Sequence, residues 1–184
     1  MNIPGAQVAL LEAGSIAFVQ ARETDIPSIE ELILEHGPNE WNHLPEAELR
    51  EYLAAIATGD VRAIYAFSKP QQLTVGVVTY DIGHRYPQYQ ALGREYEEHG
   101  YVSEAVTHKD FKGRSIGPTA LEAAIKDLTS SGLQEVYAMR HSDNEPSRRM
   151  MEKVGMVLVD EFDDPDIRPT GSRRTAVMRF STEP

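Results

Sequence analysis

The chain has 184 residues, a formal net charge of -11 and no cysteine. The length suits one domain with its own core, and the lack of cysteine excludes disulfides, thiolate metal sites and a cysteine nucleophile. A strongly acidic chain repels nucleic acid and anionic membranes, and no apolar run approaches the roughly 18 residues of a membrane span. We therefore expect a cytoplasmic protein with a single domain, residues 1–184, and neither nucleic acid nor membrane as a partner.

Strands are predicted where β-branched and aromatic residues run between turn signals. They span 15–21, 61–69, 73–82, 101–108, 134–140, 156–162 and 173–182. Helices are predicted where apolar residues recur every three or four positions. They span 24–37, 45–60, 116–130 and 145–155. In chain order the elements are a strand, two helices, three strands, a helix, a strand, a helix and two strands. This order predicts an α/β (α+β) fold, with helices on both faces of a mixed sheet.

Two segments fall outside this pattern. Residues 1–14 precede the first predicted strand, and we expect them to form an N-terminal extension. Residues 83–100 are rich in tyrosine and charge and are long for a connection between strands. Long ordered connections often carry function, so we expect an insert there, before the strand at 101–108.

The segment HKDFKGRSIGPT, residues 108–119, joins a predicted strand to a predicted helix and permits two interpretations. Its letters GRSIG fit the pattern G-x-S-x-G, in which Ser115 would be the nucleophile of a serine hydrolase. In that class an acid and then a histidine follow the serine, but His141 is the last histidine of this chain. No upstream sequence of the HGGG type would form an oxyanion hole. The serine hydrolase therefore remains only an alternative.

The second interpretation makes the same loop an anion site. The first amides of a helix are free and lie at the positive end of the helix dipole, so they bind phosphate groups. Gly113 and Gly117 allow a tight turn and a close approach of the ligand, while Lys112 and Arg114 add positive charge. Pro118 suits the first turn of a helix. The segment is thus predicted to bind a polyanion, with a plain strand-to-helix turn as the alternative.

Two linked motifs, with Lys112, Ser115 and Gly117 in this loop and with Asn144 and MEKVGM at 151–156 further along, resemble those of the GNAT superfamily of acetyltransferases. Lys112, Ser115 and Gly117 stand where that family has R/Q-x-x-G-x-G/A after its fourth strand. Further along, Asn144 opens a helix whose end, MEKVGM at 151–156, is similar to the family sequence Y-E-K-x-G-F. The resemblance implies a GNAT-like mixed, mostly antiparallel sheet of six to seven strands with helices on both faces.

The resemblance also implies acetyl-CoA as the cosubstrate. In the family the pyrophosphate rests on the amides of this loop, and the pantetheine arm pairs like an added strand with the strand at 101–108. The start of the helix opened by Asn144 would lie near that arm. The cofactor-binding residues are then expected to be Ala105, Val106, Thr107, Lys112, Gly113, Arg114, Ser115, Ile116, Gly117, Pro118, Thr119, Asn144 and Ser147.

The family reaction is a direct attack of an amine on the thioester in a ternary complex, which needs no cysteine. Because a free amine has a pKa of about 10, a base within reach is useful. Glu104 is the first candidate for that base, His141 the second and His108 the third. Met151 stands where many members place a tyrosine as general acid, and methionine cannot donate a proton. This departure leaves a non-catalytic CoA-binding sensor domain as the alternative to an N-acetyltransferase.

The acceptor is the part of the reaction that the sequence defines least. The family places it between the first two helices and the loops that face the thioester, so Trp41, Tyr86 and Tyr89 are expected to line its site. We expect an amine-bearing small molecule or peptide. The six histidines lack the spacing of a metal site, so no metal is expected. The C-terminal strands of this fold often pair between subunits, which keeps a homodimer open.

Overall fold

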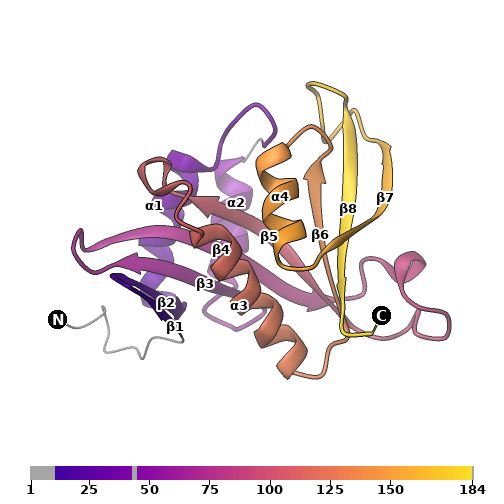
Figure 1. Ribbon diagram of the computed structural model, residues 1–184, viewed down its shortest axis with the longest axis horizontal. Helices are drawn as coiled ribbons and strands as arrows, with labels where there is room; N and C mark the ends of the chain where they lie inside the picture. The colour runs from indigo at the N-terminus through magenta and orange to yellow at the C-terminus, as the bar shows by residue number, and fades with distance from the viewer. Residues whose placement is uncertain (1–10, 43–44, 184) are drawn as a thin grey trace.

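The computed structural model describes residues 11–42 and 45–183; residues 1–10 of the expected N-terminal extension lie outside this part. The described strands form one sheet in the order β1-β2-β3-β4-β5-β6-β8-β7 (Figure 1). The strands are β1 (Leu11–Ala13), β2 (Ile16–Gln20), β3 (Val61–Ser68), β4 (Leu73–Gly83), β5 (His99–Thr107), β6 (Glu135–His141), β7 (Val157–Asp163) and β8 (Arg174–Ser181). The helices are α1 (Ile26–His36), α2 (Glu46–Ala54), α3 (Ile116–Ser130) and α4 (Glu145–Lys153).

The expected mixed, mostly antiparallel sheet is confirmed, with one difference in the number of strands. All described neighbours in the sheet pair antiparallel except β5 and β6. The sheet has eight strands rather than six to seven, because residues 11–13 of the expected extension pair with β2. Gly14 adopts a φ of 63° in the tight turn between them, a left-handed conformation that glycine adopts without steric cost.

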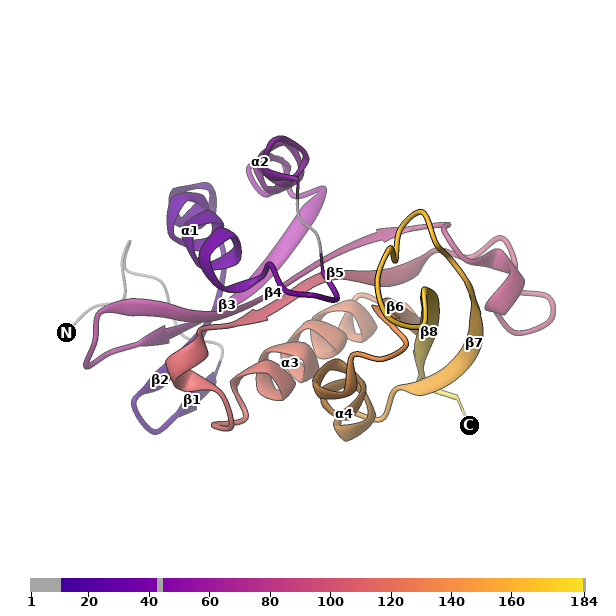
Figure 2. The ribbon, with the colours of Figure 1, turned by 90° about the horizontal axis from the view of Figure 1, so that it is seen from above.

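The helices cover both faces of the sheet, as Figure 2 shows. On one face, α1 and α2 pack over a core cluster that includes the buried Ile33 and Leu53. On the other face, α3 and α4 pack over a second cluster that includes Leu121, Leu128 and Met151. The apolar residues that recur at helical spacing along α3 thus face the sheet, as an amphipathic helix requires.

Two glycines let α3 approach the sheet closely. A methyl group at Gly100 would lie 2.6 Å from Leu128 Cδ1, and one at Gly76 would overlap the side chain of Ile116. Ile116 is the first residue of α3, so its contact with Gly76 holds the N-terminus of this helix against β4. The loop that precedes α3 is thereby fixed at the sheet.

A bulge in the middle of β5 changes the face of the sheet to which the following side chains point. Ser103 and Glu104 stand together opposite the single residue Thr79 of β4, and the Glu104 amide donates a hydrogen bond to Thr79 Oγ1 at 3.1 Å. The extra residue shifts the alternation of the strand. As a result Val102 packs in the core under α3, whereas Val106 packs in the core under α1 and α2.

β5 and β6 are joined only at their beginnings. Their parallel pairing covers three residue pairs, from Gly100 opposite Val136 to Val102 opposite Ala138. Beyond these pairs the two strands diverge (Figure 1). Among the described residues, the edge of β5 from Ser103 to Thr107 therefore has no strand partner on the side of β6.

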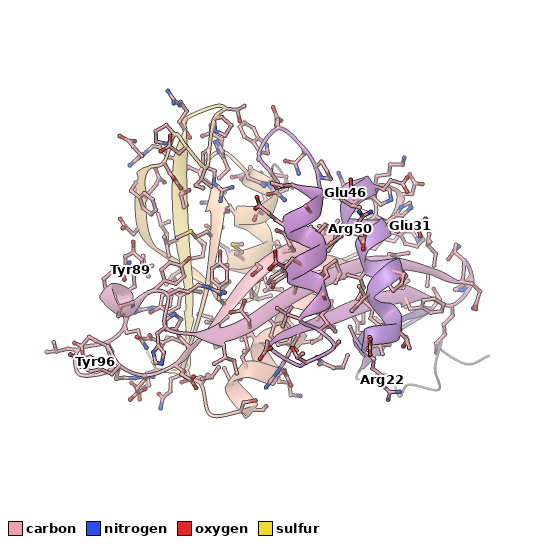
Figure 3. The ribbon with its side chains drawn as sticks, turned by 180° about the vertical axis from the view of Figure 1, so that it is seen from behind. Arg22, Glu31, Glu46, Arg50, Tyr89 and Tyr96 are labelled. Carbon is pink, nitrogen blue, oxygen red and sulfur yellow. The ribbon has the colours of Figure 1, made fainter. Side chains whose placement is uncertain are left out.

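The expected insert at 83–100 is shortened by the strands on either side, because β4 extends to Gly83 and β5 begins at His99. Between them the chain forms a short 3₁₀ turn at Pro87–Tyr89. In Figure 3, Tyr89 and Tyr96 of this segment lie at the opposite end of the molecule from Glu31 of α1.

Candidate active site

A cleft of about 970 Å³ opens where β5 and β6 part. Its lining comes from both faces of the sheet. The end of α1 and the loop after it contribute from one face, and the starts of α3 and α4 contribute from the other (Figure 2). The β7–β8 loop, residues 164–173, adds further lining. The cleft thus brings together segments that are distant in the sequence.

The loop before α3 presents a group of unpaired backbone amides. Gly113 and Ser115 adopt φ values of 78° and 59°, and these left-handed residues turn the chain so that the helix begins at Ile116. Within the described part of the chain, the amides of residues 112–117 donate no hydrogen bond to another protein group. Free amides at the positive end of a 15-residue helix are able to bind an anion.

Positive charge at this loop comes partly from a residue that the sequence analysis did not select. Lys153, at the end of α4, donates a hydrogen bond from Nζ to Ser115 Oγ at 3.0 Å. Lys112 lies exposed on the same loop. The MEKVGM motif contains Lys153, but only the packing of α4 beside α3 brings it to the loop.

Two of the residues predicted to bind the cofactor lie outside the cleft lining. Arg114 places its guanidinium over the ring of Phe111, 4.8 Å from the ring centroid. The Thr119 amide donates a hydrogen bond to the Ser115 carbonyl oxygen at 3.1 Å, as the helical geometry requires. The other predicted residues of this loop, namely Lys112, Gly113, Ser115, Ile116, Gly117 and Pro118, line the cleft.

The residues predicted on β5 and at the start of α4 line the cleft as well. Ala105 is exposed on the free edge of β5 and Thr107 is half-buried there. Val106 turns its side chain into the core under α1 and α2, so it offers the cleft chiefly its backbone. Asn144 Oδ1 accepts a hydrogen bond from the Ser147 amide at 3.1 Å and thereby caps α4.

Glu104 lies half-buried in the cleft, at the bulge of β5. Asn42 Nδ2 donates a hydrogen bond to Glu104 Oε2 at 3.4 Å. Desolvation raises the pKa of the Glu104 carboxyl to about 7, although the hydrogen bond from Asn42 and the charge of Arg168 both act to lower it. A carboxyl group with such a pKa can accept and release a proton near neutral pH.

The two histidines that were also candidates for the base make hydrogen bonds with the backbone. The amide of Asp143 donates to His141 Nδ1 at 3.0 Å, and His141 Nε2 lies 2.9 Å from the Thr170 carbonyl oxygen. With Nδ1 as an acceptor, the proton sits on Nε2, and both ring nitrogens are occupied. His108 Nδ1 accepts a hydrogen bond from the Asp110 amide at 3.2 Å, and His108 is not part of the cleft lining.

Of the three aromatic residues expected at the acceptor site, only Trp41 lines the cleft. Its ring lies against that of His141, with 4.6 Å between the centroids. Tyr86 is buried in a separate cluster with residues of β6 and β8. The Tyr89 hydroxyl donates a hydrogen bond to Asp160 Oδ2 at 2.6 Å. Tyr86 and Tyr89 therefore pack behind the cleft rather than in it.

Tyr101 and Arg168 line the cleft near Trp41, and sequence reasoning selected neither. The Arg85 guanidinium lies 4.4 Å from the ring centroid of Tyr101. Arg168 Nε donates a hydrogen bond to Thr175 Oγ1 at 3.1 Å, and Nη1 donates to the Trp41 carbonyl oxygen at 3.4 Å. No local motif marks Arg168. Its position in the cleft results from the pairing of β7 with β8, which brings their connecting loop to the cleft.

Ser115 lacks the surroundings of a serine nucleophile. Its Oγ accepts the hydrogen bond from Lys153, and no histidine of the described ranges is hydrogen-bonded to it. The residue instead ends the loop that leads into α3. The geometry therefore gives no support to the serine hydrolase.

Two other kinds of site are missing from the described residues. In ranges 11–42 and 45–183, no three His, Asp or Glu side chains gather in a way that could hold a metal ion. Likewise, none of the helices in these ranges has the length and apolar character that a membrane crossing requires.

Solved acetyltransferases share this fold at low sequence identity. Ribosomal-protein-S5-alanine acetyltransferase from Vibrio fischeri gives a TM-score of 0.71 at 14% identity, over 96% of this chain and 97% of that chain. Arabidopsis thaliana NAA60 in complex with acetyl-CoA gives a TM-score of 0.72 at 15% identity, over 92% of this chain and 99% of that chain. Arabidopsis thaliana Naa50, in complex with the bisubstrate analogue CoA-Ac-MVNAL, gives a TM-score of 0.67 at 15% identity, over 91% of this chain and 99% of that chain. The chain therefore shares the fold of these solved structures.

The family follows from the sequence match. The model of the Acetyltransferase (GNAT) family matches residues 26–156, a stretch that includes β5, the loop before α3, and α4. The chain belongs to the GNAT acetyltransferase family. Among curated proteins, none matches the chain by sequence.

Proposed function

We propose that the protein is an N-acetyltransferase, which transfers an acetyl group from acetyl-CoA to an amine of a small molecule or peptide. The observation behind this proposal is that one cleft contains the free edge of β5, the unpaired amides of residues 112–117 and the carboxyl group of Glu104. A transferase that joins an anionic carrier to an amine needs all three.

The residues present fit an acyl-CoA. The amides of residues 112–117, with Lys112 and Lys153 beside them, would hold a diphosphate. The free edge of β5 around Ala105 and Thr107 would pair with the amide groups of a pantetheine arm, as an added strand does. When bound, acetyl-CoA would supply the activated acyl group as a thioester.

Glu104 is the proposed base. Because its pKa is about 7, the carboxylate form exists at neutral pH and still accepts a proton readily. It would take the proton that the acceptor ammonium must lose, either directly or through one water. The attacking nitrogen then forms its bond to the acyl carbon while the carbon–sulfur bond breaks, and the nitrogen releases its second proton to solvent. Backbone amides of the β5 edge would stabilise the negative charge on the carbonyl oxygen.

The start of α4 offers a hydroxyl in place of the tyrosine that many family members have. Met151 is buried, and its Sδ lies 4.0 Å from Ser147 Oγ. Ser147 lines the cleft, so its hydroxyl or solvent would return a proton to the leaving sulfur. His141, by contrast, is assigned the role of holding the Thr170 carbonyl and the Asp143 amide.

Calorimetric titration with acetyl-CoA, followed by a CoA-release assay on a panel of amines, tests the proposal. We expect micromolar affinity in the wild type and a loss of about tenfold or more in Ser115→Asp, because a carboxylate would repel the diphosphate. Ser131→Asp, at the other end of α3, is the matched control and should keep the affinity.

Each outcome of this experiment has a distinct meaning. If the folded wild type bound no acetyl-CoA, the acetyltransferase assignment would fail. Binding without turnover on the whole panel would favour the CoA-binding sensor domain, for which the missing tyrosine is the supporting feature. Turnover that survives in Ser131→Asp and falls in Ser115→Asp supports the enzyme.

A further inference from the structure

We propose that the acceptor carries a carboxylate close to its amine, as a free amino acid does, and that Arg168 binds this carboxylate. The inference rests on the proposed N-acetyltransferase function and narrows its substrate class. Four properties of Arg168 and its surroundings support it: the donors left free, the missing counter-ion, the position relative to Glu104 and the apolar surface nearby.

The guanidinium of Arg168 is held in place but keeps a donor group free. Its Nε and Nη1 donate to Thr175 Oγ1 and to the Trp41 carbonyl oxygen. Within the described residues, Nη2 has no hydrogen-bond acceptor. A second contact joins the same two loops, because Thr170 Oγ1 donates to the Glu40 carbonyl oxygen at 2.6 Å. The side chain is thus fixed in orientation, as a recognition group should be.

Arg168 also has no carboxylate within ion-pair distance among the described residues, whereas Arg174 on the adjoining strand β8 pairs with Glu161. Asp164 of the same loop accepts a hydrogen bond from Thr175 Oγ1 at 2.6 Å and does not pair with Arg168. Burial lowers the pKa of Arg168, although the charges of Asp164 and Glu104 act to raise it, because the hydration that a half-buried cation loses is only partly replaced. A ligand carboxylate would supply the missing negative charge.

Glu104 and Arg168 face the same part of the cleft. Both line it, and each is close enough for its charge to affect the pKa of the other. A zwitterionic amino acid would present its ammonium group to Glu104 and its carboxylate to Arg168. Each charge of such a ligand would then meet its complement, and the pair would orient the nitrogen for attack.

Apolar side chains surround these two charged groups. Trp41 and Tyr101 line the cleft, and Ile167 lies next to Arg168 in the β7–β8 loop with 64% of its surface exposed. Such surface suits an apolar amino-acid side chain better than a polar one. Phenylalanine and leucine are therefore the amino acids to test first.

The experiment compares acids with neutral analogues of the same shape. The CoA-release rate is measured for L-phenylalanine against L-phenylalaninamide, and for L-leucine against L-leucinamide, in the wild type and in variants. We expect Arg168→Gln to lower the acid-to-amide ratio of kcat/KM by about 10- to 100-fold, because a charge-assisted hydrogen-bond pair is lost. Comparing ratios between proteins cancels the different basicity of the acid and amide amines.

Two further variants separate recognition from loop structure. Arg173→Gln removes an exposed charge from the same loop and should leave the ratio unchanged. Arg168→Lys keeps the charge but not the planar fork, so its ratio should lie between those of the wild type and Arg168→Gln. It also tests the inference if Arg168→Gln fails to fold.

The outcomes keep the inference apart from the proposed function. If the wild type acetylates amides, simple amines or peptide N-termini as well as the free acids, or if Arg168→Gln leaves the ratio unchanged, the inference is overturned and the acetyltransferase stands. If no acceptor is turned over, the proposed function fails. The inference is then tested by titrating L-phenylalanine and its amide into the protein saturated with acetyl-CoA, where equal affinities or no binding would overturn it.

Discussion

At the scale of single residues, Glu104 shows how the fold raises the pKa of an ordinary carboxyl group toward neutral pH. A glutamate in water has a pKa of about 4.3 and is a weak base at neutral pH. In the cleft the side chain is half-buried and receives one long hydrogen bond, from Asn42. Desolvation outweighs that bond and the charge of Arg168, so the pKa rises to about 7.

We expect Glu104→Gln to lower kcat/KM by about 100-fold or more, because glutamine cannot accept the proton. In the wild type, kcat/KM should rise as the pH increases through about 7. Glu104 must be ionised to act, so its pKa in the folded protein sets this rising limb of the pH profile. In the variant this limb should disappear, and only the increase from deprotonation of the acceptor amine should remain. Steady-state CoA-release assays across this pH range would measure both effects.

If a Glu104→Gln variant kept its activity and the same rise of kcat/KM near pH 7, the base would have to be another residue. His141 would then be the first residue to re-examine, because it lines the same cleft. Glu104→Asp is the matched control, since it keeps a carboxylate on a shorter side chain. Its kcat/KM should lie between those of the wild type and the glutamine variant.

The residues that sequence could predict are those whose local pattern has a physical meaning. Gly113, Gly117 and Pro118 mark the start of a helix, and the basic residues near them indicate an anion site. Arg168 and Tyr101 could not be found this way. Their position in the cleft depends on how distant strands pair, and nothing in their sequence neighbours encodes that pairing.

At the scale of elements, one hydroxyl group connects three of them. Thr79 of β4 is buried, and its Oγ1 accepts the hydrogen bond from the Glu104 amide in the β5 bulge. The Tyr52 hydroxyl of α2 donates to the same Oγ1 at 3.2 Å. Thr79 therefore fixes the bulge that presents Glu104 to the cleft.

Replacing Thr79 with valine keeps the volume of the side chain but removes the acceptor. We expect Thr79→Val to lower the free energy of unfolding by about 1–3 kcal/mol, because the Glu104 amide loses its partner. The value of kcat should fall more than the affinity for acetyl-CoA, which we assign to the loop before α3. Urea unfolding, CoA-release assays and calorimetry would measure the three quantities.

Thr74→Val is the matched control in the same strand. Thr74 is also buried, and its Oγ1 donates a hydrogen bond to Ser28 Oγ at 3.2 Å, away from the bulge. This variant should lose stability without the selective loss of kcat. Equal kinetic effects in the two variants would argue against a positioning role for Thr79.

The elements were predicted best where their boundaries have a local cause. The predicted helix at 116–130 matches α3, since glycines and a proline mark its start and Gly132 follows its end. The predicted helix at 45–60 ends earlier, at Ala54, because the chain continues as tighter turns in which the Ile56 amide bonds to the Leu53 carbonyl oxygen. The bulge in β5 was missed because it depends on the register against β4.

At the scale of the whole molecule, the cleft separates two parts of one sheet. Strands β1 to β5 form the larger part and β6, β8 and β7 the smaller, with the three residue pairs of β5 and β6 as the direct link within the sheet. The packing of α3 against α4 adds a second connection on one face. A ligand in the cleft would therefore contact both parts at once.

We expect acetyl-CoA at about 100 times its Kd to stabilise the folded protein by about 2.7 kcal/mol, as mass action requires for a ligand of the native state. For a chain of this size the Tm should rise by about 5–10 °C. A thermal melt with and without acetyl-CoA measures the shift. Ser115→Asp, with an affinity about tenfold lower or more, should show about half of this shift or less at the same concentration, and an unchanged Tm in the wild type would contradict a specific site.

The position of the cleft between two faces of the sheet has a kinetic consequence. The loop after α1 and the β7–β8 loop approach it from the face of α1 and α2, while the loop before α3 and the start of α4 approach it from the opposite face. Donor and acceptor would then enter by separate routes and meet within the plane of the sheet. Neither would block the path of the other, so the two substrates could add in either order, and each product could leave by the entrance its parent had used.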